Sequence, residues 1–311
     1  DMMGNTIHNW DMLERGYTMH HAISQDKQGN ILATVSKTSA KIANGKDVRI
    51  NDFIIMMDPE KGEILQEWDL VHMLDSARYG MTDYDLTSDP FAQSASNWAH
   101  NNGIVEWGDD YLATARYQGI FKFNKAGGIE WIISPHGYWR DKYLKLLLNP
   151  LHADGTPITD PEVIAGTKNC DDFEWPWGCH TAVPLPNGHI LYFNNGYGRN
   201  FKLDFTDRKN IYTCGIEYEV DEVNRTVRQV WQYGKERGAA YFTPARSGVQ
   251  YLEQTGNRLI CPGMSNVLSN GNRGARVTEV DPETQDVVFE LELEDAIYQR
   301  VYRMSLYPEN Q

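Results

Sequence analysis

The sequence predicts an all-β protein, a β-propeller built from four-stranded antiparallel blades. Three observations support this prediction. A four-strand pattern recurs four times along the chain, turns rich in Asp, Asn and Gly separate the strands, and helix-like segments are scarce. Meanders of this kind stack radially as blades, which leaves only short sheet edges exposed. With 311 residues, 41% of them hydrophobic, the chain can bury a large core.

The four predicted blades span residues 18–75, 98–140, 178–235 and 245–295. The strands expected in the first are 21–23, 31–35, 52–58 and 63–68, and in the second 100–105, 111–116, 119–123 and 128–132. Those expected in the third are 180–183, 186–193, 215–220 and 226–231, and in the fourth 247–251, 257–261, 275–281 and 287–291. The segments 58–62 and 281–285 have the composition of hairpin turns.

The two ends of the chain also read as pieces of blades. Residues 1–15 resemble the end of a blade, with an outermost strand at 6–10, and residues 298–308 resemble an inner, closing strand. Either these pieces close a fifth blade, or earlier blades are missing from this chain. We therefore predict a single propeller domain over 1–311 that is incomplete at its N-terminus. Short helices are expected only at 70–77 and 141–148.

Charge and hydropathy exclude two classes of partner. The formal net charge is −14, from 43 acidic and 29 basic residues, whereas nucleic-acid binding needs a basic face. No apolar run approaches the length of about 18 residues that a membrane span requires. An anionic small molecule stays compatible with the sequence, because a site can be locally positive on an acidic protein.

The four cysteines are Cys170, Cys179, Cys214 and Cys261, and no CxxC pair is present, which argues against a zinc ribbon or a thioredoxin-type site. Cys170 and Cys179 close a short loop rich in Asp, Trp and Pro. We favour a disulfide between them over two free thiols, which would imply an oxidising compartment.

Histidines open three of the four predicted blades, namely His21, His100 and His180. Since the first strand of each blade lines the central channel, these imidazoles should converge there. Arg116 ends the second strand of the blade that His100 opens, and a guanidinium beside several imidazoles suits an oxyanion. His20 should face away by strand alternation. Further polar lining is expected from Asn101, Thr181, Asn195 and Arg199, and Tyr117 lies near the same loops.

A histidine cluster has two competing uses. Three histidines can bind zinc with one open position, although no HxH or HxxxH spacing occurs here. Alternatively, one histidine is a nucleophile and the others act as acid, base and clamp in a metal-free group transfer. The neighbouring arginine favours the second use, so we expect no metal and no other cofactor.

Several stretches of the chain resemble the bacterial arylsulfate sulfotransferases. The resemblance covers nearly the whole sequence, and its most specific stretches are 97–101 (NWAHN), 115–118 (ARYQ), 179–182 (CHTA), 185–191 (LPNGHIL), 194–196 (NNG) and 227–238 (VRQVWQYGKERG). The resemblance implies a six-bladed propeller, an additional N-terminal β-rich domain and a periplasmic location. This chain departs from the family in lacking that domain and at least one blade, and in having Asn97 where an acidic residue is frequent.

The resemblance also implies an activity. Such enzymes transfer a sulfuryl group from a phenolic sulfate ester to a phenol without the nucleotide sulfate donor, by a ping-pong mechanism through a sulfated histidine. By motif and spacing His180 is similar to that nucleophile, His100 and Arg116 to the residues that hold the sulfuryl oxygens, and His21 to a further channel histidine. A short disulfide ahead of the nucleophile, which Cys170 and Cys179 could supply, is another family feature.

The expected partners are therefore an aryl sulfate donor and a phenolic acceptor, and a homodimer is the assembly to test. We expect substrate contacts from the following residues: Asn101, Tyr117, Thr181, Asn195 and Arg199. Two other functions stay open at this point. One is a propeller that binds a ligand without catalysis, and the other is a metal-dependent propeller hydrolase or lyase.

Overall fold

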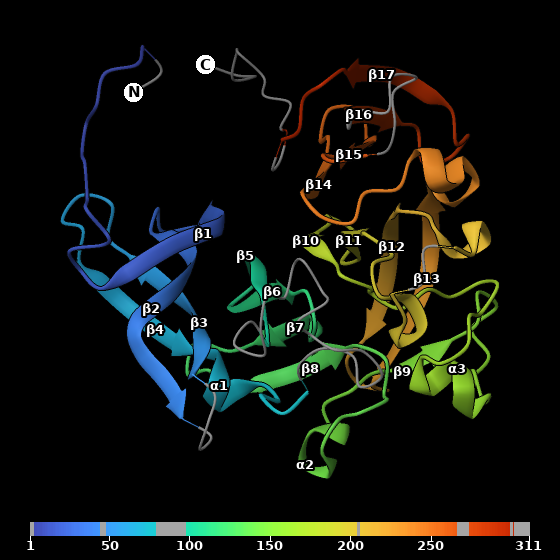
Figure 1. The fold of residues 1–311 in the computed structure, drawn as a ribbon, viewed down its shortest axis with the longest axis horizontal. Coiled ribbons are helices and arrows are strands. Elements are labelled where there is room, and N and C mark those ends of the chain that lie inside the picture. The colour runs from blue at the N-terminus through green and yellow to red at the C-terminus, as the bar shows by residue number, and fades with distance from the viewer. Residues whose placement is uncertain are drawn as a thin grey trace.

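The computed structural model describes residues 3–43, 48–78, 98–203, 206–265, 274–298 and 301. Four sheets are built on antiparallel meanders of four consecutive strands, and the third has one additional strand at its edge. The sheets follow one another around an arc, and Figure 1 shows their first strands nearest its centre. The predicted all-β propeller is confirmed, and the described residues form four of its blades.

The strands lie close to their predicted positions. The first two blades are β1 (Tyr17–Gln25), β2 (Ile31–Ala43), β3 (Val48–Met57) and β4 (Ile64–Asp69), then β5 (Asn101–Trp107), β6 (Asp110–Ala115), β7 (Gly119–Phe123) and β8 (Ile129–Ile133). The last two are β10 (His180–Pro184), β11 (Ile190–Asn194), β12 (Cys214–Asp221) and β13 (Thr226–Tyr233), then β14 (Ser247–Tyr251), β15 (Arg258–Pro262), β16 (Ala275–Val280) and β17 (Val287–Leu293).

Packing between successive blades forms the core. The first strands contact one another in chain order, β1 with β5, β5 with β10 and β10 with β14. Along β6, Leu112 packs toward the third blade, whereas the next residue, Ala113, packs toward the first. This alternation follows from the two-residue period of a strand, and it explains why both faces of a blade are apolar.

The turns that were predicted between outer strands are present. Asp58 Oδ1 accepts hydrogen bonds from the N–H groups of Glu60 and Lys61, and Gly62 closes the turn with a φ of 67°. Asp281 organises the matching turn of the fourth blade in the same way, through the N–H groups of Glu283 and Thr284. Aspartate side chains favour such turns because they bind the backbone two residues further on.

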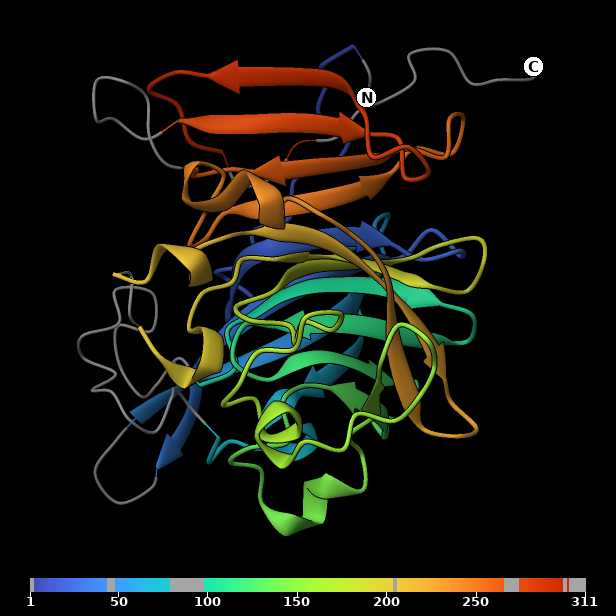
Figure 2. The same cartoon turned by 90° about the vertical axis from the view of Figure 1, so that its right-hand side faces the viewer.

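Short helices and one extra strand decorate the blades. The helices are α1 (Leu70–Met73), α2 (Asp141–Leu144) and α3 (Pro161–Ala165), and the 3-10 helices are η2 (Arg199–Phe201), η3 (Arg208–Asn210) and η4 (Lys235–Ala240). The first two helices fall within the predicted segments 70–77 and 141–148, whereas α3 was not predicted. Strand β9 (Asn149–Leu151) pairs in parallel with β13, so the third sheet has five strands. Figure 2 shows the β14–β17 sheet at one end of the molecule and α2 at the other.

The predictions for the chain ends have separate outcomes. Residues 5–10 contain no strand, so the outermost strand predicted at 6–10 is wrong. Instead, the Trp10 ring packs on Gly62, and its Nε1 donates to the carbonyl of Pro59 at 3.0 Å. Apart from residues 298 and 301, the closing strand predicted at 298–308 lies outside the described residues. No helix of the described residues is long and apolar enough to cross a membrane.

Shortening Ile120 to alanine should destabilise the fold strongly. Ile120 is fully buried between the second and third blades, so an Ile120→Ala change should lower the free energy of unfolding by about 2–5 kcal/mol. Urea unfolding followed by tryptophan fluorescence measures this loss. The control is Val223→Ala, because Val223 is 91% exposed and its truncation removes little buried surface. Equal losses in the two variants would contradict the assigned core.

Candidate active site

Irregular backbone marks the start of each inner strand that carries a predicted histidine. The pairing of β1, β5 and β10 with their neighbours shifts register between Met19 and Ile23, between Asn101 and Gly103, and between His180 and Ala182, respectively. His21, His100 and Thr181 have positive φ angles of 54°, 53° and 48°. Such bulges redirect side chains and are common beside active sites.

These distortions bring the predicted histidines together. Nε2 of His21 lies 3.2 Å from Nε2 of His100, and the centres of the His21 and His180 rings are 6.3 Å apart. His180 is buried, His100 is half-buried and His21 is exposed. Three imidazoles from three blades thus meet where the inner strands converge.

The expectation that His20 faces away is wrong. Because the bulge interrupts strand alternation, Nδ1 of His20 lies 3.0 Å from Nδ1 of His21. On its other side, Nε2 of His20 is 3.7 Å from a carboxylate oxygen of Asp52, a buried residue of β3. Sequence reasoning missed both His20 and Asp52, although the adjacent pair His20–His21 was a visible signal.

The four groups form a chain from Asp52 through His20 and His21 to His100. Asp52 is fixed by the N–H of Asn101, which donates to Oδ2 at 3.0 Å. Burial raises the pKa of the Asp52 carboxyl and lowers that of His20, although their mutual attraction opposes both shifts. His21 uses opposite nitrogens for its two histidine contacts, so these rings form a linear series that can relay a proton rather than a shared set of metal ligands.

His180 is held in one tautomer. Its Nδ1 lies 2.6 Å from Oδ1 of Asn195 and 3.2 Å from the carbonyl oxygen of Gly178. Both partners are acceptors, because the Asn195 amide nitrogen donates to the carbonyl of Thr243 at 2.8 Å. In the neutral ring the proton therefore sits on Nδ1, and Nε2 is the nitrogen that carries the electron pair.

Arg116 is a buried cation beside these rings. Its side chain is 2% exposed, its Nη2 donates to the carbonyl of Pro244 at 2.8 Å, and its guanidinium lies over the Tyr197 ring at 4.4 Å from the centre. Burial lowers the pKa of His100 well below its usual value, and the nearby His21 and Arg116 lower it further. His100 is consequently neutral at physiological pH.

Three of the predicted substrate-binding residues are placed beside the histidines. Asn101 is fully buried, and neither its amide nitrogen nor its amide oxygen has a hydrogen-bond partner among the described residues. The same holds for the hydroxyl of Thr181, which directly follows His180. The Tyr117 ring lies perpendicular to that of His100, with 6.2 Å between their centres. Since buried polar groups are normally satisfied, Asn101 and Thr181 are suited to bind a ligand.

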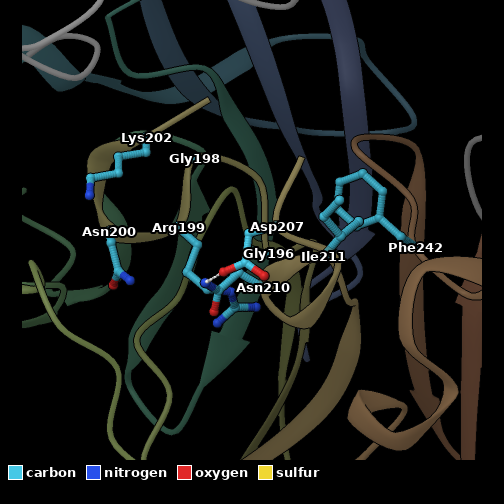
Figure 3. A pocket seen from close by; sticks show the side chains of 9 residues that line it. All are labelled: Gly196, Gly198, Arg199, Asn200, Lys202, Asp207, Asn210, Ile211 and Phe242. Carbon is cyan, nitrogen blue, oxygen red and sulfur yellow. Dashed lines mark hydrogen bonds between the residues drawn. The ribbon is translucent and has the colours of Figure 1, made fainter. Parts of the chain in front are cut away.

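The other two candidates have different surroundings. Asn195 contacts His180, so it positions that ring. Arg199 forms a buried ion pair with Glu174 and lies over the Tyr212 ring at 3.9 Å from the centre. Figure 3 shows Arg199 at the wall of a cavity of about 130 Å³, together with Asn210 and Phe242. Because Glu174 and Tyr212 hold its guanidinium, the geometry favours a structural role for Arg199.

The predicted disulfide is absent. Neither Cys170 nor Cys179 forms a disulfide. The Cys179 thiol is buried and lies 4.0 Å from the carbonyl of Ala115, whereas the Cys170 thiol donates to Asp172. The two thiols have different neighbours, so the prediction of a Cys170–Cys179 bond is corrected to two free cysteines.

Comparison with known proteins identifies the family of the chain. The family model described as arylsulfotransferase (ASST) matches residues 1–303. The chain belongs to the arylsulfotransferase family. It is 29% identical over 98% of its length to a protein named arylsulfate sulfotransferase AssT from Escherichia coli O6:H1, and 30% identical over 98% to one of the same name from Lelliottia amnigena. In both cases the match covers 56% of the relative, so the chain spans about half the length of these arylsulfotransferases.

The low pKa of His100 predicts a pH-dependent stability. A group whose pKa is lower in the folded state binds fewer protons there, so the free energy of unfolding falls as pH drops below the ordinary histidine pKa. Between about pH 7.5 and pH 5.5, His100 should account for about 1 kcal/mol of this fall. Urea unfolding at both pH values should show a smaller fall for His100→Gln than for the wild type. His72→Gln, at a side chain that is 83% exposed, should keep the wild-type difference. A His100→Gln variant that also kept it would contradict the assigned environment.

Proposed function

We propose that this chain transfers a sulfuryl group from a phenolic sulfate ester to a phenol, with Nε2 of His180 as the nucleophile. The observation that supports this most is the tautomer of His180. Two acceptors, Asn195 Oδ1 and the Gly178 carbonyl, favour the tautomer with the proton on Nδ1, in which Nε2 carries the electron pair for attack. Family membership supplies the reaction class, and the two named relatives are arylsulfate sulfotransferases.

In the proposed first step, the Nε2 electron pair attacks sulfur in line with the ester oxygen. A nitrogen–sulfur bond forms, the sulfur–oxygen bond breaks, and the phenolate leaves with the bonding electrons. The imidazole then carries a positive charge, which Asn195 Oδ1 and the Gly178 carbonyl stabilise through the Nδ1 proton. A proton taken up from solvent and passed along the histidine series would convert the phenolate into the phenol product.

In the second step, the acceptor phenol loses its proton to the same series, and its oxygen attacks sulfur while the nitrogen–sulfur bond breaks. The sulfate ester supplies the sulfuryl group directly. The proposed scheme therefore uses neither a nucleotide sulfate donor nor a metal. His100, whose pKa is lowered by burial, suits this task because a neutral imidazole can accept a proton on one ring nitrogen and release the proton from the other.

The sulfuryl oxygens carry spread negative charge in the transition state. Arg116 is a buried cation whose charge acts on His100, and Asn101 and Thr181 offer polar groups that no described residue satisfies. Preorganised donors of this kind typically lower a barrier by about 3 kcal/mol each. We assign Arg116 and His100 to the sulfuryl oxygens, and Asn101, Thr181 and Tyr117 to the rest of the substrate.

The family resemblance also leads us to propose a periplasmic location. Fractionation of the source cell tests this location.

Replacing His180 should abolish transfer. A His180→Ala variant has no nucleophile, so release of nitrophenol from a nitrophenyl sulfate in the presence of a phenol should stop. Wild-type protein mixed with the donor alone should gain a sulfuryl group, a mass increase of about 80 Da, on the peptide that contains His180.

The control is His189→Ala, which removes a histidine of the same blade that pairs with Glu217 outside the cluster. It should keep both the turnover and the adduct. Normal turnover in His180→Ala, or an adduct on another peptide, would refute His180 as the nucleophile.

Asn195 should act through the tautomer of His180. Asn195→Leu removes the acceptor at Nδ1 and should lower kcat by about 10²-fold or more. Asn195→Asp keeps an acceptor but adds a charge, which stabilises protonated His180. The acid limb of its kcat/KM profile should therefore move to higher pH, because only neutral His180 attacks.

The matched control is Ser247→Ala. Ser247 also donates to Asn195 Oδ1, at 3.2 Å, but its loss leaves the His180 contact in place. A purely structural role for Asn195 would lower activity without moving the pH profile of Asn195→Asp, and that result would refute the assignment.

A further inference from the structure

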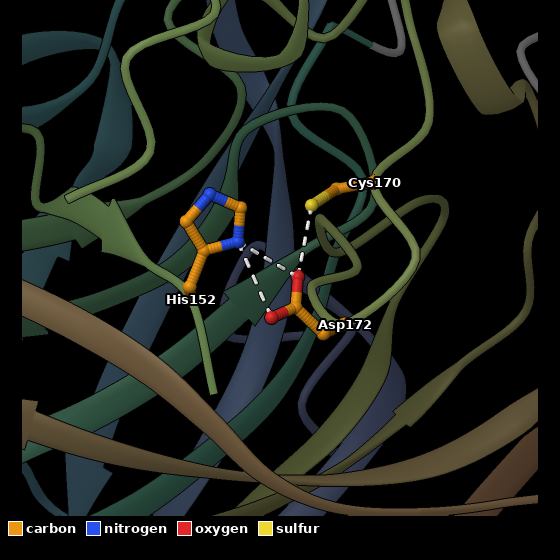
Figure 4. Close-up of side chains that lie close together, drawn as sticks. All are labelled: His152, Cys170 and Asp172. Carbon is orange, nitrogen blue, oxygen red and sulfur yellow. Dashed lines mark hydrogen bonds and ion pairs between the residues drawn. The ribbon is translucent and has the colours of Figure 1, made fainter. Parts of the chain in front are cut away.

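A second cluster of metal-ligating side chains lies outside the histidine site. His152, Cys170 and Asp172 each offer one ligand atom, and these three atoms lie within 4.8 Å of one another. Within the described part of the chain, no other group of three or more His, Cys, Asp and Glu side chains meets this criterion. Figure 4 shows the imidazole and the thiol both directed at the Asp172 carboxylate.

We propose that His152, Cys170 and Asp172 form a binding site for a divalent metal ion of the zinc class. A thiolate, an imidazole and a carboxylate together favour Zn²⁺ over the harder Mg²⁺ or Ca²⁺, which take oxygen ligands. Three protein ligands plus one water would complete the tetrahedral set. All three residues are half-buried, so water reaches the fourth position.

The distances fit a shared ion. Nδ1 of His152 lies 3.0 Å from Oδ1 of Asp172, and the Cys170 sulfur lies 3.1 Å from the same oxygen. Bond lengths of about 2.0–2.3 Å around tetrahedral zinc place neighbouring ligand atoms roughly 3.3–3.6 Å apart. Small side-chain shifts would thus open the space that the ion needs.

Hydrogen bonds join the three side chains at this site. The thiol donates to the carboxylate, and the imidazole shares its Nδ1 with the same group. A dication would displace the thiol proton, because cysteine binds metal ions as the thiolate.

Both ligand-bearing segments are anchored on β13, so the site is preorganised. Strand β9, directly before His152, pairs with β13, and Arg228 of β13 donates to the carbonyl of Ala153 at 2.9 Å. On the other segment, the N–H of Glu174 donates to the Gln229 side chain at 2.9 Å. The Ala153 N–H also donates to Oδ2 of Asp172 at 2.9 Å, which joins the two segments. A bound ion would link these two segments to each other, close to the start of the stretch of chain that leads to His180.

The test uses the full chain, reduced and freed of metal, titrated with Co²⁺ and then with Zn²⁺. We expect one Co²⁺ per chain with a thiolate-to-cobalt absorption band that Zn²⁺ displaces. Zn²⁺ should also raise the unfolding temperature in proportion to the logarithm of its free concentration. Both readouts are independent of sulfuryl transfer, so the outcome does not depend on the proposed activity.

Three variants separate a metal site from a structural cluster. Cys170→Ser should lose the absorption band, and Asp172→Asn and His152→Ala should each weaken Co²⁺ binding by at least about tenfold. His189→Ala should bind Co²⁺ as the wild type does, because the His189–Glu217 pair, with 2.6 Å between Nδ1 and Oε1, has no thiol. A wild-type protein without the band, a band that survives Cys170→Ser, or equal losses in His152→Ala and His189→Ala would overturn the proposal.

Discussion

The hydrogen bond between Nδ1 of His180 and Oδ1 of Asn195 is the interaction on which the candidate site depends. It fixes the tautomer of a buried imidazole, and Asn195 is itself fixed from outside its own sheet. The Asn195 amide donates to the Thr243 carbonyl, and Ser247 of β14 donates to its oxygen. The ring orientation of His180 is thereby tied to the contact between the third and fourth blades, so that packing of the propeller and chemistry at its centre are coupled.

How far the sequence predicts this molecule depends on whether local rules hold. Strands and turns follow from a two-residue apolar period and from residues such as Asp58 and Asp281, whose side chains organise their own turns. The convergence of His21, His100 and His180 follows from the repeat alone. The orientation of His20 was mispredicted because a bulge, which depends on three-dimensional pairing, breaks the alternation that the prediction assumed. Asp52 was missed because nothing local connects it to the histidines.

The segment between β8 and β10 shows the same limit. Helix α3 had a readable signature, since Asp160 caps it, Pro161 follows and Gly166 ends it in a left-handed conformation. By contrast, β9 joins the third sheet as an edge strand through three residues that have no strand pattern of their own.

The ion pair of Arg199 with Glu174 is also a long-range contact. An arginine that looked available for substrate is instead required to neutralise a buried carboxylate, because an unpaired buried charge is costly.

The electrostatics of the centre are compatible with the proposed reaction of an anionic ester on an acidic chain. The net charge of the protein sets the long-range electrostatic field. The stability of a transition state depends mainly on the charged and polar groups within a few ångströms of it. There the protein places Arg116 beside His100, and burial lowers the pKa values of His100 and His20, so a permanent cation lies next to rings that favour the neutral form. Fully protonated histidines would bind a sulfate ester more tightly, yet they would have no electron pair for attack. Burial that keeps imidazoles neutral therefore favours reaction over ground-state binding, which is the balance that a nucleophilic histidine requires.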